Sequence, residues 1–125
     1  MDASLQLYRR MVFNVVARNN DDHTKNFSFL MDRQGKWKLA PAYDLCYSYK
    51  PGGRWIGQHQ LSLNGKQDHF SRQDLLTTGE KMGIRRCGEI VDEVIEAVSK
   101  WPDIAQSCDV RESHITEIRK NLLLL

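Results

Sequence analysis

Polar side chains gather in two short stretches of the sequence, on either side of a pair of apolar runs. The first stretch is residues 19–26, NNDDHTKN, and the second ends at Asp44. Carboxylate and amide oxygens suit hard cations such as Mg²⁺, which proteins usually hold with one or two carboxylates together with phosphate oxygens. Asp21, Asn26 and Asp44 are therefore candidate site residues, provided that the chain brings them together.

The segment between these stretches predicts a β-hairpin. Residues 27–31 and 37–40 are largely apolar, and residues 32–36, DRQGK, have the composition of a turn. A hairpin returns the chain to its starting end, so Asn26 and Asp44 should lie at the same end, with Asp21 on that side. Ligands of one Mg²⁺ ion sit about 2.1 Å from it, hence within about 4 Å of one another. We expect the Asn26 and Asp44 side chains to approach within that reach.

A helix is predicted ahead of the polar stretch. Apolar residues recur with helical spacing at Leu5, Tyr8, Met11, Val12 and Val15. Nearly every residue from Met11 to Ala17 is apolar, which predicts burial on most sides, and Asn14 within this run needs a hydrogen-bond partner. The helix should end near Asn19, because asparagine side chains compete with the backbone for hydrogen bonds.

The residues after Asp44 predict an ordered loop followed by helices. The aromatic loop leads to a brief strand at residues 60–63, which ends at an Asn64-Gly65 turn. Ser71 and Asp74 predict the capped start of a helix that runs to about Met82.

Two further helices are predicted near the end of the sequence. One has an apolar stripe at Ile90, Val91, Val94, Ile95 and Val98, and Pro102 ends it or starts a short new turn. Asp109 with Glu112 predicts the cap of the last helix, which is lined by Ile115, Ile118, Leu122 and Leu125. These patterns together predict a single, mainly α domain over residues 1–125 that carries one small β-hairpin.

Composition excludes several classes of protein. The 125 residues suit one domain, and 41% hydrophobic with 27% charged residues is typical of globular proteins. No run approaches the roughly 18 apolar residues of a membrane helix, and no N-terminal signal peptide is visible. Cys46, Cys87 and Cys108 lack zinc spacing and a disulfide framework, which favours a cytoplasmic protein with buried or idle thiols.

The charge is unevenly distributed along the chain. Residues 1–54 carry nine Lys/Arg and five Asp/Glu, a balance of +4, whereas residues 55–125 carry nine and eleven, a balance of −2. The basic half contains the polar stretch, so a phosphate-bearing ligand would be attracted there. An unevenly charged but idle surface explains the same numbers, because four charges make a weak field.

Two motifs in this region resemble a known family. Residues 21–30, DDHTKNFSFL, followed by residues 39–45, LAPAYDL, resemble the catalytic core of the HipA family. These are serine/threonine kinases that act as the toxins of bacterial toxin–antitoxin pairs. The resemblance covers roughly residues 5–65, and the remainder fits the helical C-terminal lobe in general character. It implies a domain like a kinase C-terminal lobe, in which the hairpin carries the catalytic loop.

The resemblance also implies roles for individual residues. Asp21 matches the aspartate that takes or orients the proton of the substrate hydroxyl, with the Asp-x-x-x-x-Asn spacing of kinase catalytic loops. Asn26 and Asp44 match the residues that hold Mg²⁺ and, with it, ATP. His23 and Lys25 match the family motif as well, and Lys25 could neutralise charge on the transferring phosphate. Asp22 is a weaker candidate, because the family varies there.

The family's kinases also need a part that this sequence lacks. No Gly-rich loop precedes a strand, and no strand with a suitable lysine lies before Leu5. We therefore expect an excised C-terminal lobe or one half of a split protein, inactive in isolation. The implied partners are an N-terminal kinase lobe, a HipB-like DNA-binding antitoxin and a protein substrate. We expect no contact with a membrane, and contact with nucleic acid only through the antitoxin.

Two alternatives remain open from the sequence. One is a non-catalytic, kinase-like interaction module that binds an antitoxin or a companion lobe. The other is a metal-dependent phosphodiesterase or nuclease that uses Asp21, Asp22, His23 and Asp44, although no further ligands for a two-metal site follow Asp44. The remaining histidines show no ligand spacing and are interpreted as ordinary surface or core residues: His59, His69 and His114.

Overall fold

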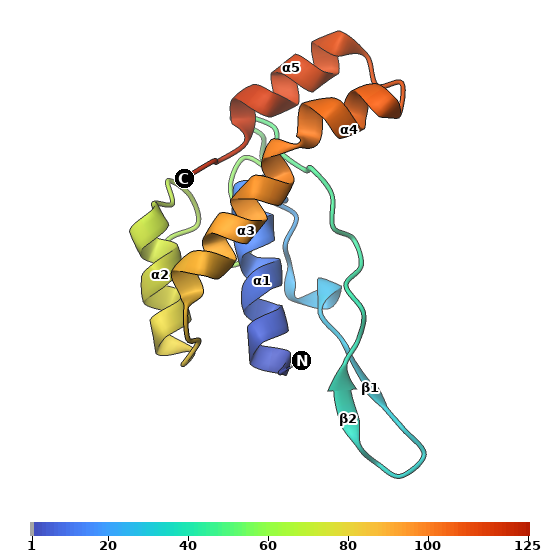
Figure 1. The fold of residues 1–125 in the computed structure, drawn as a ribbon, viewed down its shortest axis with the longest axis vertical. Helices are drawn as coiled ribbons and strands as arrows, with labels where there is room; N and C mark the ends of the chain where they lie inside the picture. Colours follow the sequence, from blue (N-terminus) through green and yellow to red (C-terminus); the bar gives the residue numbers. More distant parts are fainter. Residues whose placement is uncertain (1) are drawn as a thin grey trace.

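The computed structural model describes residues 2–125 and has a mainly helical fold (Figure 1). In chain order its elements are α1 (Ala3–Val16), the 3-10 turn η1 (Thr24–Asn26), β1 (Phe29–Met31), β2 (Trp37–Leu39), α2 (Arg72–Lys81), α3 (Cys87–Ser99), α4 (Trp101–Ser107) and α5 (Glu112–Asn121). Within these residues no helix combines the length and the apolar character that crossing a membrane requires. The prediction of a mainly α domain with one small hairpin is confirmed.

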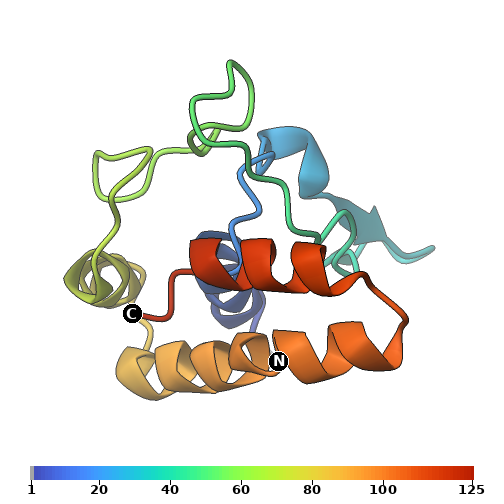
Figure 2. The same ribbon diagram turned by 90° about the horizontal axis from the view of Figure 1, so that it is seen from above.

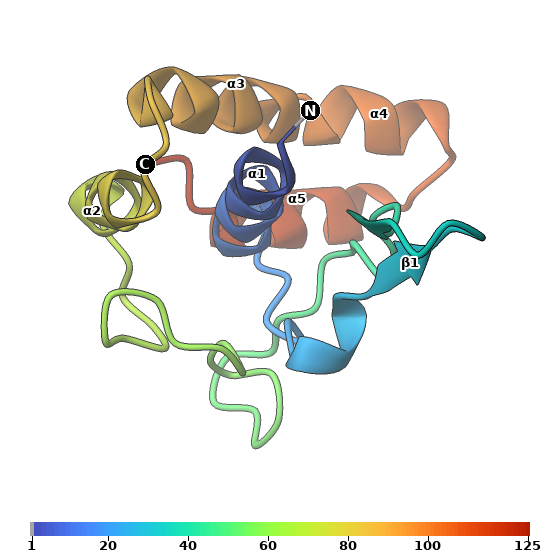
Figure 3. The same ribbon diagram turned by 90° about the horizontal axis from the view of Figure 1, so that it is seen from below.

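Helix α1 is the central element of the core. It packs against α3, while α2, α4 and α5 surround it, as the end-on views show (Figures 2 and 3). The side chains of Tyr8, Val12 and Val16 are completely buried, and Asp2 caps the helix by accepting a hydrogen bond from the Ser4 N–H. The helix is therefore a rigid support whose C-terminal end leads directly into the polar stretch.

The hairpin projects away from the helices (Figure 1). Its strands pair antiparallel, with Phe29 opposite Leu39 and Met31 opposite Trp37. Phe29, Met31 and Trp37 share one face of the hairpin and are 51%, 57% and 63% exposed. Leu30 on the opposite face is 47% exposed, so apolar side chains contact solvent on both faces. Unpartnered apolar surface of this kind marks an interaction site.

Two local sequence motifs, a helix cap and a turn, form the structures that they predict. Ser71 and Asp74 form a reciprocal capping box at the start of α2. The Asp74 carboxylate accepts hydrogen bonds from Ser71, Lys66 and Asn64, and these bonds hold its pKa well below the ordinary value. Asn64 and Gly65 have φ values of 50° and 75°, the left-handed geometry of a two-residue hairpin turn.

Residues 60–63 were predicted to form a strand and do not. The turn at Asn64 is flanked only by an isolated bridge between Leu63 and Lys66. The backbone N–H groups of Gln60 and Leu61 donate to the Asp22 carboxylate, at 2.8 and 3.3 Å, and not to a neighbouring strand. Because the Asp22 carboxylate accepts these N–H groups, the alternating sequence pattern does not produce a strand here.

The predicted start and length of the last helix are also wrong. Asp109 (φ 57°) is the left-handed residue that ends α4, and Arg111, which makes no side-chain cap bond, precedes α5. Leu122 is already extended, and the Leu123 N–H donates to the Val16 carbonyl oxygen at 2.9 Å. The terminal leucines therefore leave the helix to cover the end of α1.

Gly79→Ala is expected to destabilise the fold by about 1–3 kcal/mol, although alanine ordinarily favours a helix. A Cβ atom at Gly79 would lie 2.7 Å from Cβ of Cys87 and 2.8 Å from Cζ of Tyr8, so α1, α2 and α3 would have to move apart. Urea-induced unfolding measures the effect. Gly88→Ala in α3 is the matched control, because its nearest neighbour is at 3.8 Å; equal stability of the two variants would contradict this close packing.

Candidate functional site

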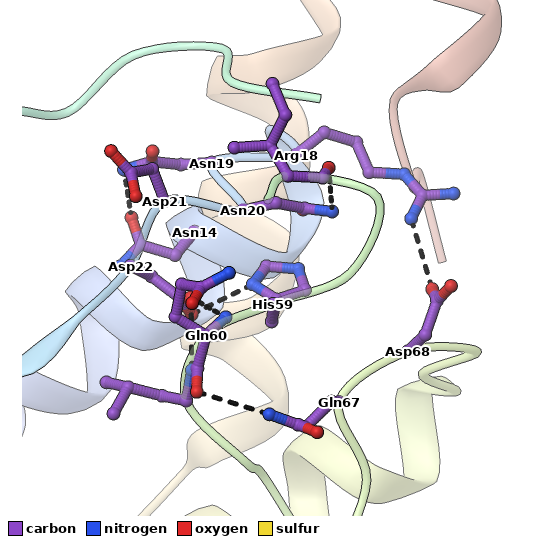
Figure 4. A network of polar contacts seen from close by, with 12 residues as sticks. Asn14, Arg18, Asn19, Asn20, Asp21, Asp22, His59, Gln60, Gln67 and Asp68 are labelled. Carbon is purple, nitrogen blue, oxygen red and sulfur yellow. Dashed lines mark hydrogen bonds and ion pairs between the residues drawn. The ribbon is translucent and has the colours of Figure 1, made fainter. Parts of the chain in front are cut away.

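Asparagines fix the chain where it leaves α1 (Figure 4). The Asn19 backbone N–H donates to the Asn14 carbonyl oxygen, and the Asn19 Nδ2 donates to the Asn14 Oδ1, both at 2.9 Å. Asn14 thus has the partner that its buried position requires. The Asn20 N–H donates to the Ser48 carbonyl oxygen at 3.0 Å, and Asn20 is completely buried. The residue immediately before Asp21 is therefore held rigidly.

The candidate catalytic loop closes on itself. The Asn26 Nδ2 donates to the backbone carbonyl oxygen of Asp21 at 3.0 Å, across the turn η1. This bond uses the nitrogen of the Asn26 amide, and within residues 2–125 no donor bonds its oxygen. The Asp21 side chain is 49% exposed and its carboxylate accepts no hydrogen bond in the same range. Both oxygen groups are free to bind a ligand.

Hydrogen bonds from side chains to backbone carbonyl oxygens bring the segment around Asp44 alongside this loop. The Tyr43 hydroxyl donates to the Lys25 carbonyl oxygen at 2.7 Å, and the Asn19 Nδ2 donates to the Asp44 carbonyl oxygen at 3.1 Å. A parallel bridge between Asn19 and Ser48 continues the contact. Asp44 itself has φ 54°, an uncommon conformation for a non-glycine residue that persists where surrounding bonds impose it and is frequent at functional sites.

The carboxylates of Asp21 and Asp44 both affect the pKa of one neighbouring thiol, that of Cys46. Burial raises the pKa of the Cys46 thiol, and the negative charges of Asp44 and Asp21 raise it further. Asp21 and Asp44 therefore contribute to one negative region around Cys46. Carboxylate oxygens and the Asn26 amide oxygen are of the type that Mg²⁺ prefers. That Asn26 and Asp44 share one ion stays a prediction.

Lys25 is an exposed residue of the loop, whereas His23 is half-buried. The His23 Nε2 is 4.0 Å from the Asp21 Oδ1, which is too long for a hydrogen bond. Lys25 is exposed, and its ammonium group forms no ion pair in the portion of the chain that is described. Lys25 thus has no carboxylate partner among these residues, whereas His23 has a contact with Asp21 only at the limit of an ion pair.

Asp22 points inward, in the opposite sense to Asp21 (Figure 4). Its Oδ1 accepts the N–H groups of Gln60 and Leu61, and its Oδ2 is 2.9 Å from the His59 Nδ1. Asp22 and His59 are only 7% and 1% exposed. Because a carboxylate accepts, the Nδ1 carries the proton of this bond. The pair clamps residues 59–61 beneath the candidate catalytic loop.

Sequence reasoning missed this clamp. Asp22 was judged by its motif alone, and His59 was interpreted as an ordinary histidine. His59 is a core residue, packed edge-on to Phe70 at 5.2 Å between ring centres, but its bond to Asp22 joins positions 37 residues apart. No local pattern signals such a pairing, because His59 stands between Gln58 and Gln60 in an ordinary polar stretch.

Comparison with known proteins identifies the family. The model of the HipA-like C-terminal domain matches residues 1–101. The chain belongs to this family. The HipA-like domain is 54% identical over 106 residues, 77% of the chain, to the Sinorhizobium fredii protein named "Putative kinase Y4mE". It is 25% identical over 143 aligned positions, 96% of the chain, to a Haemophilus influenzae protein named "Putative kinase".

The HipA-like chain spans less than half of the length of these relatives. It covers 24% of the Sinorhizobium protein and 41% of the Haemophilus protein. No solved structure matches the chain. The residues discussed above, from Asp21 to Asp44, all fall inside the matched HipA-like domain.

Proposed function

We propose that residues 1–125 form the C-terminal lobe of a HipA-like serine/threonine protein kinase. The observation that carries the proposal is the contact between the loop and the Asp44 segment, made by Tyr43 with Lys25 and by Asn19 with Asp44. This contact brings the segment that carries Asp44 alongside the loop that carries Asp21 and Asn26, which supports a shared site of two carboxylates and an amide oxygen. Kinases use that set, because phosphoryl transfer requires positioning and charge neutralisation more than covalent chemistry.

Each residue has a defined role in this proposal. Asp21, with its carboxylate unoccupied, accepts the proton of the substrate hydroxyl. Asn26 and Asp44 would hold Mg²⁺, which neutralises charge on the phosphates of ATP when it is bound. Lys25 contributes a further positive charge toward the phosphate, and His23 places an imidazole 4.0 Å from the Asp21 carboxylate. Asp22 and His59 fix the backbone on which Asp21 is carried.

The rest of the nucleotide site is assigned to a companion N-terminal lobe. Residues 1–125 supply only one wall of the cleft, so on their own they should be inactive. The wider assignment, also proposed, is a cytoplasmic toxin of a toxin–antitoxin pair, which phosphorylates a protein and meets DNA only through a HipB-like antitoxin.

Binding of Mg²⁺-ATP by residues 1–125 alone is expected to be weak or absent, because the affinity of a nucleotide site comes from both walls of a cleft. Isothermal titration calorimetry checks this directly. The full-length protein that contains these residues should bind ATP and transfer labelled phosphate to serine or threonine, and Asp44→Asn should abolish the transfer. Micromolar binding by the isolated chain would refute the assignment of half a kinase, and nucleic-acid cleavage in place of labelling would refute the kinase.

The nuclease alternative is disfavoured by Asp22. It needs this carboxylate as a metal ligand, but the carboxylate is buried and bonded to His59 and to two backbone N–H groups. The non-catalytic interaction module is favoured by one observation, the exposed apolar side chains of the hairpin. Those side chains are equally expected of a kinase lobe that has a companion, so labelling with ATP separates the two.

A further inference from the structure

Strand β2 has an unpaired edge. The Ala40 N–H donates to the Ser28 carbonyl oxygen at 2.9 Å, so alternate residues along this side of the hairpin direct their backbone groups toward the β1 side. Trp37 and Leu39 lie between those positions and direct their N–H and C=O groups away from β1. No hydrogen bond to these groups occurs between residues 2 and 125. An edge of this kind accepts an additional strand.

The unpaired edge borders a groove against the N-terminal half of α1. Two cavities, of about 340 and 310 Å³, share Gln6 as a lining residue and so adjoin one another. We call them together the α1–β2 groove; the first is also lined by Ala3, Trp37, Lys38 and Leu39, and the second by Arg9, Arg10, Pro41 and Ala42. Figure 3 shows this arrangement from the N-terminal end of α1, with the hairpin beside the helix.

Arg10 is a buried cation without a counter-charge. Its side chain is 8% exposed, and its NH2 nitrogen donates to the Ala40 carbonyl oxygen at 2.7 Å and weakly to Gln6. Its NH1 nitrogen is buried and has no partner, and no carboxylate of residues 2–125 pairs with it. Buried guanidinium groups are ordinarily paired, because removing a charge from water without compensation is costly.

The charged residues that line the groove are all basic. Its lining contains Arg9, Arg10 and Lys38 and no acidic residue. Arg9 forms an exposed ion pair with Glu93, but its Nε lacks a partner. A second copy of this chain would present the same cations to the groove, so pairing between two β2 strands is disfavoured. The charge selects an acidic occupant.

We propose that the α1–β2 groove receives an extended, acidic segment that adds to the edge of β2 and places a carboxylate against Arg10. Because an unpaired buried charge is costly, the occupant is a permanent neighbour and not a transient ligand. We assign it to the companion lobe, so the inference rests on the proposed two-lobed protein. Apolar side chains of the same segment would cover Trp37.

The test attaches a probe to the chain itself. The peptide Ser-Val-Glu-Val-Glu-Thr is fused ahead of Ala3 through a ten-residue Gly/Ser linker, which spans about 18 Å and supplies a high effective concentration. A matched fusion replaces each glutamate of the peptide with lysine. We expect the acidic fusion to lower the equilibrium constant of unfolding in urea by at least about tenfold relative to the lysine fusion, through the groove contacts.

Two variants identify the groove as the origin of that difference. Arg10→Met removes the buried charge, and the exposed Lys38→Gln weakens the same contacts with little risk to folding. Both should reduce the difference between the fusions, Arg10→Met more strongly. Equal stability of the two fusions, or an unchanged difference in Lys38→Gln, would overturn the proposal. Self-association of the unfused chain that Trp37→Ser abolishes would instead identify a second copy as occupant. Unfolding involves no ATP, so absent kinase activity would refute the proposed function without affecting this result.

Discussion

Asp21→Asn in the full-length protein is expected to lower phosphoryl transfer by about 10²–10⁴-fold, the usual contribution of a positioned general base. The asparagine keeps the size of the side chain but cannot accept the proton of the substrate hydroxyl. Initial rates of phosphate transfer from labelled ATP, measured over a range of substrate concentrations, give the effect on kcat. The KM for ATP should change little, because Asn26 and Asp44 remain in place.

The same substitution should hardly affect folding. The Asp21 side chain is 49% exposed and accepts no hydrogen bond from residues 2–125, so the free energy of unfolding should change by about 1 kcal/mol or less. Asp103→Asn is the matched control: it makes the same chemical change at an exposed position in α4. Equal activity of the two variants would contradict the role of Asp21 as base.

Asp22→Ala, unlike Asp21→Asn, should strongly destabilise the fold, by about 3–5 kcal/mol. The substitution leaves His59 and the backbone N–H groups of residues 60 and 61 without their buried acceptor. Urea-induced unfolding of residues 1–125 measures the loss. Asp22→Asn should cost less, because an amide oxygen can still accept one of the N–H groups.

A double-mutant cycle assigns part of this loss to the clamp. His59→Ala alone also removes packing on Phe70, so the two single variants should not be additive when combined. The coupling energy between Asp22 and His59 should exceed 1 kcal/mol, on the order expected for residues in one buried network. Independent, additive losses would show that the bond at 2.9 Å contributes nothing to stability.

Local signals predicted the elements of this fold well. The α2 capping box, the Asn64-Gly65 turn and the turn between β1 and β2 depend on residues that lie within a few positions of one another. Their backbone geometry follows from side chains that bond nearby N–H groups or tolerate positive φ. The same applies to the loop from Asp21 to Asn26, whose closing bond spans five residues.

Features that depend on distant contacts could not be predicted in this way. The strand pattern at residues 60–63 fails because Asp22, 38 positions before Gln60, takes the N–H group that a sheet would use. The last helix ends early because Leu123 bonds to Val16. The Asp22 side chain points inward and the Asp21 side chain points outward because of what packs beneath the loop. Two adjacent aspartates look alike in the sequence, so this difference could not be predicted from it.

The cover that residues 121–123 place over the end of α1 has a consequence for synthesis of the chain. The Arg18 Nε donates to the Asn121 carbonyl oxygen at 2.8 Å, between positions 103 residues apart, and Leu123 bonds to Val16 beside it. Ribosomes add about 5–20 residues per second, so roughly 5–20 s separate these partners during translation. The nascent chain therefore carries the loop from Asp21 to Asn26 on an unfinished support until residues 121–123 have left the ribosome.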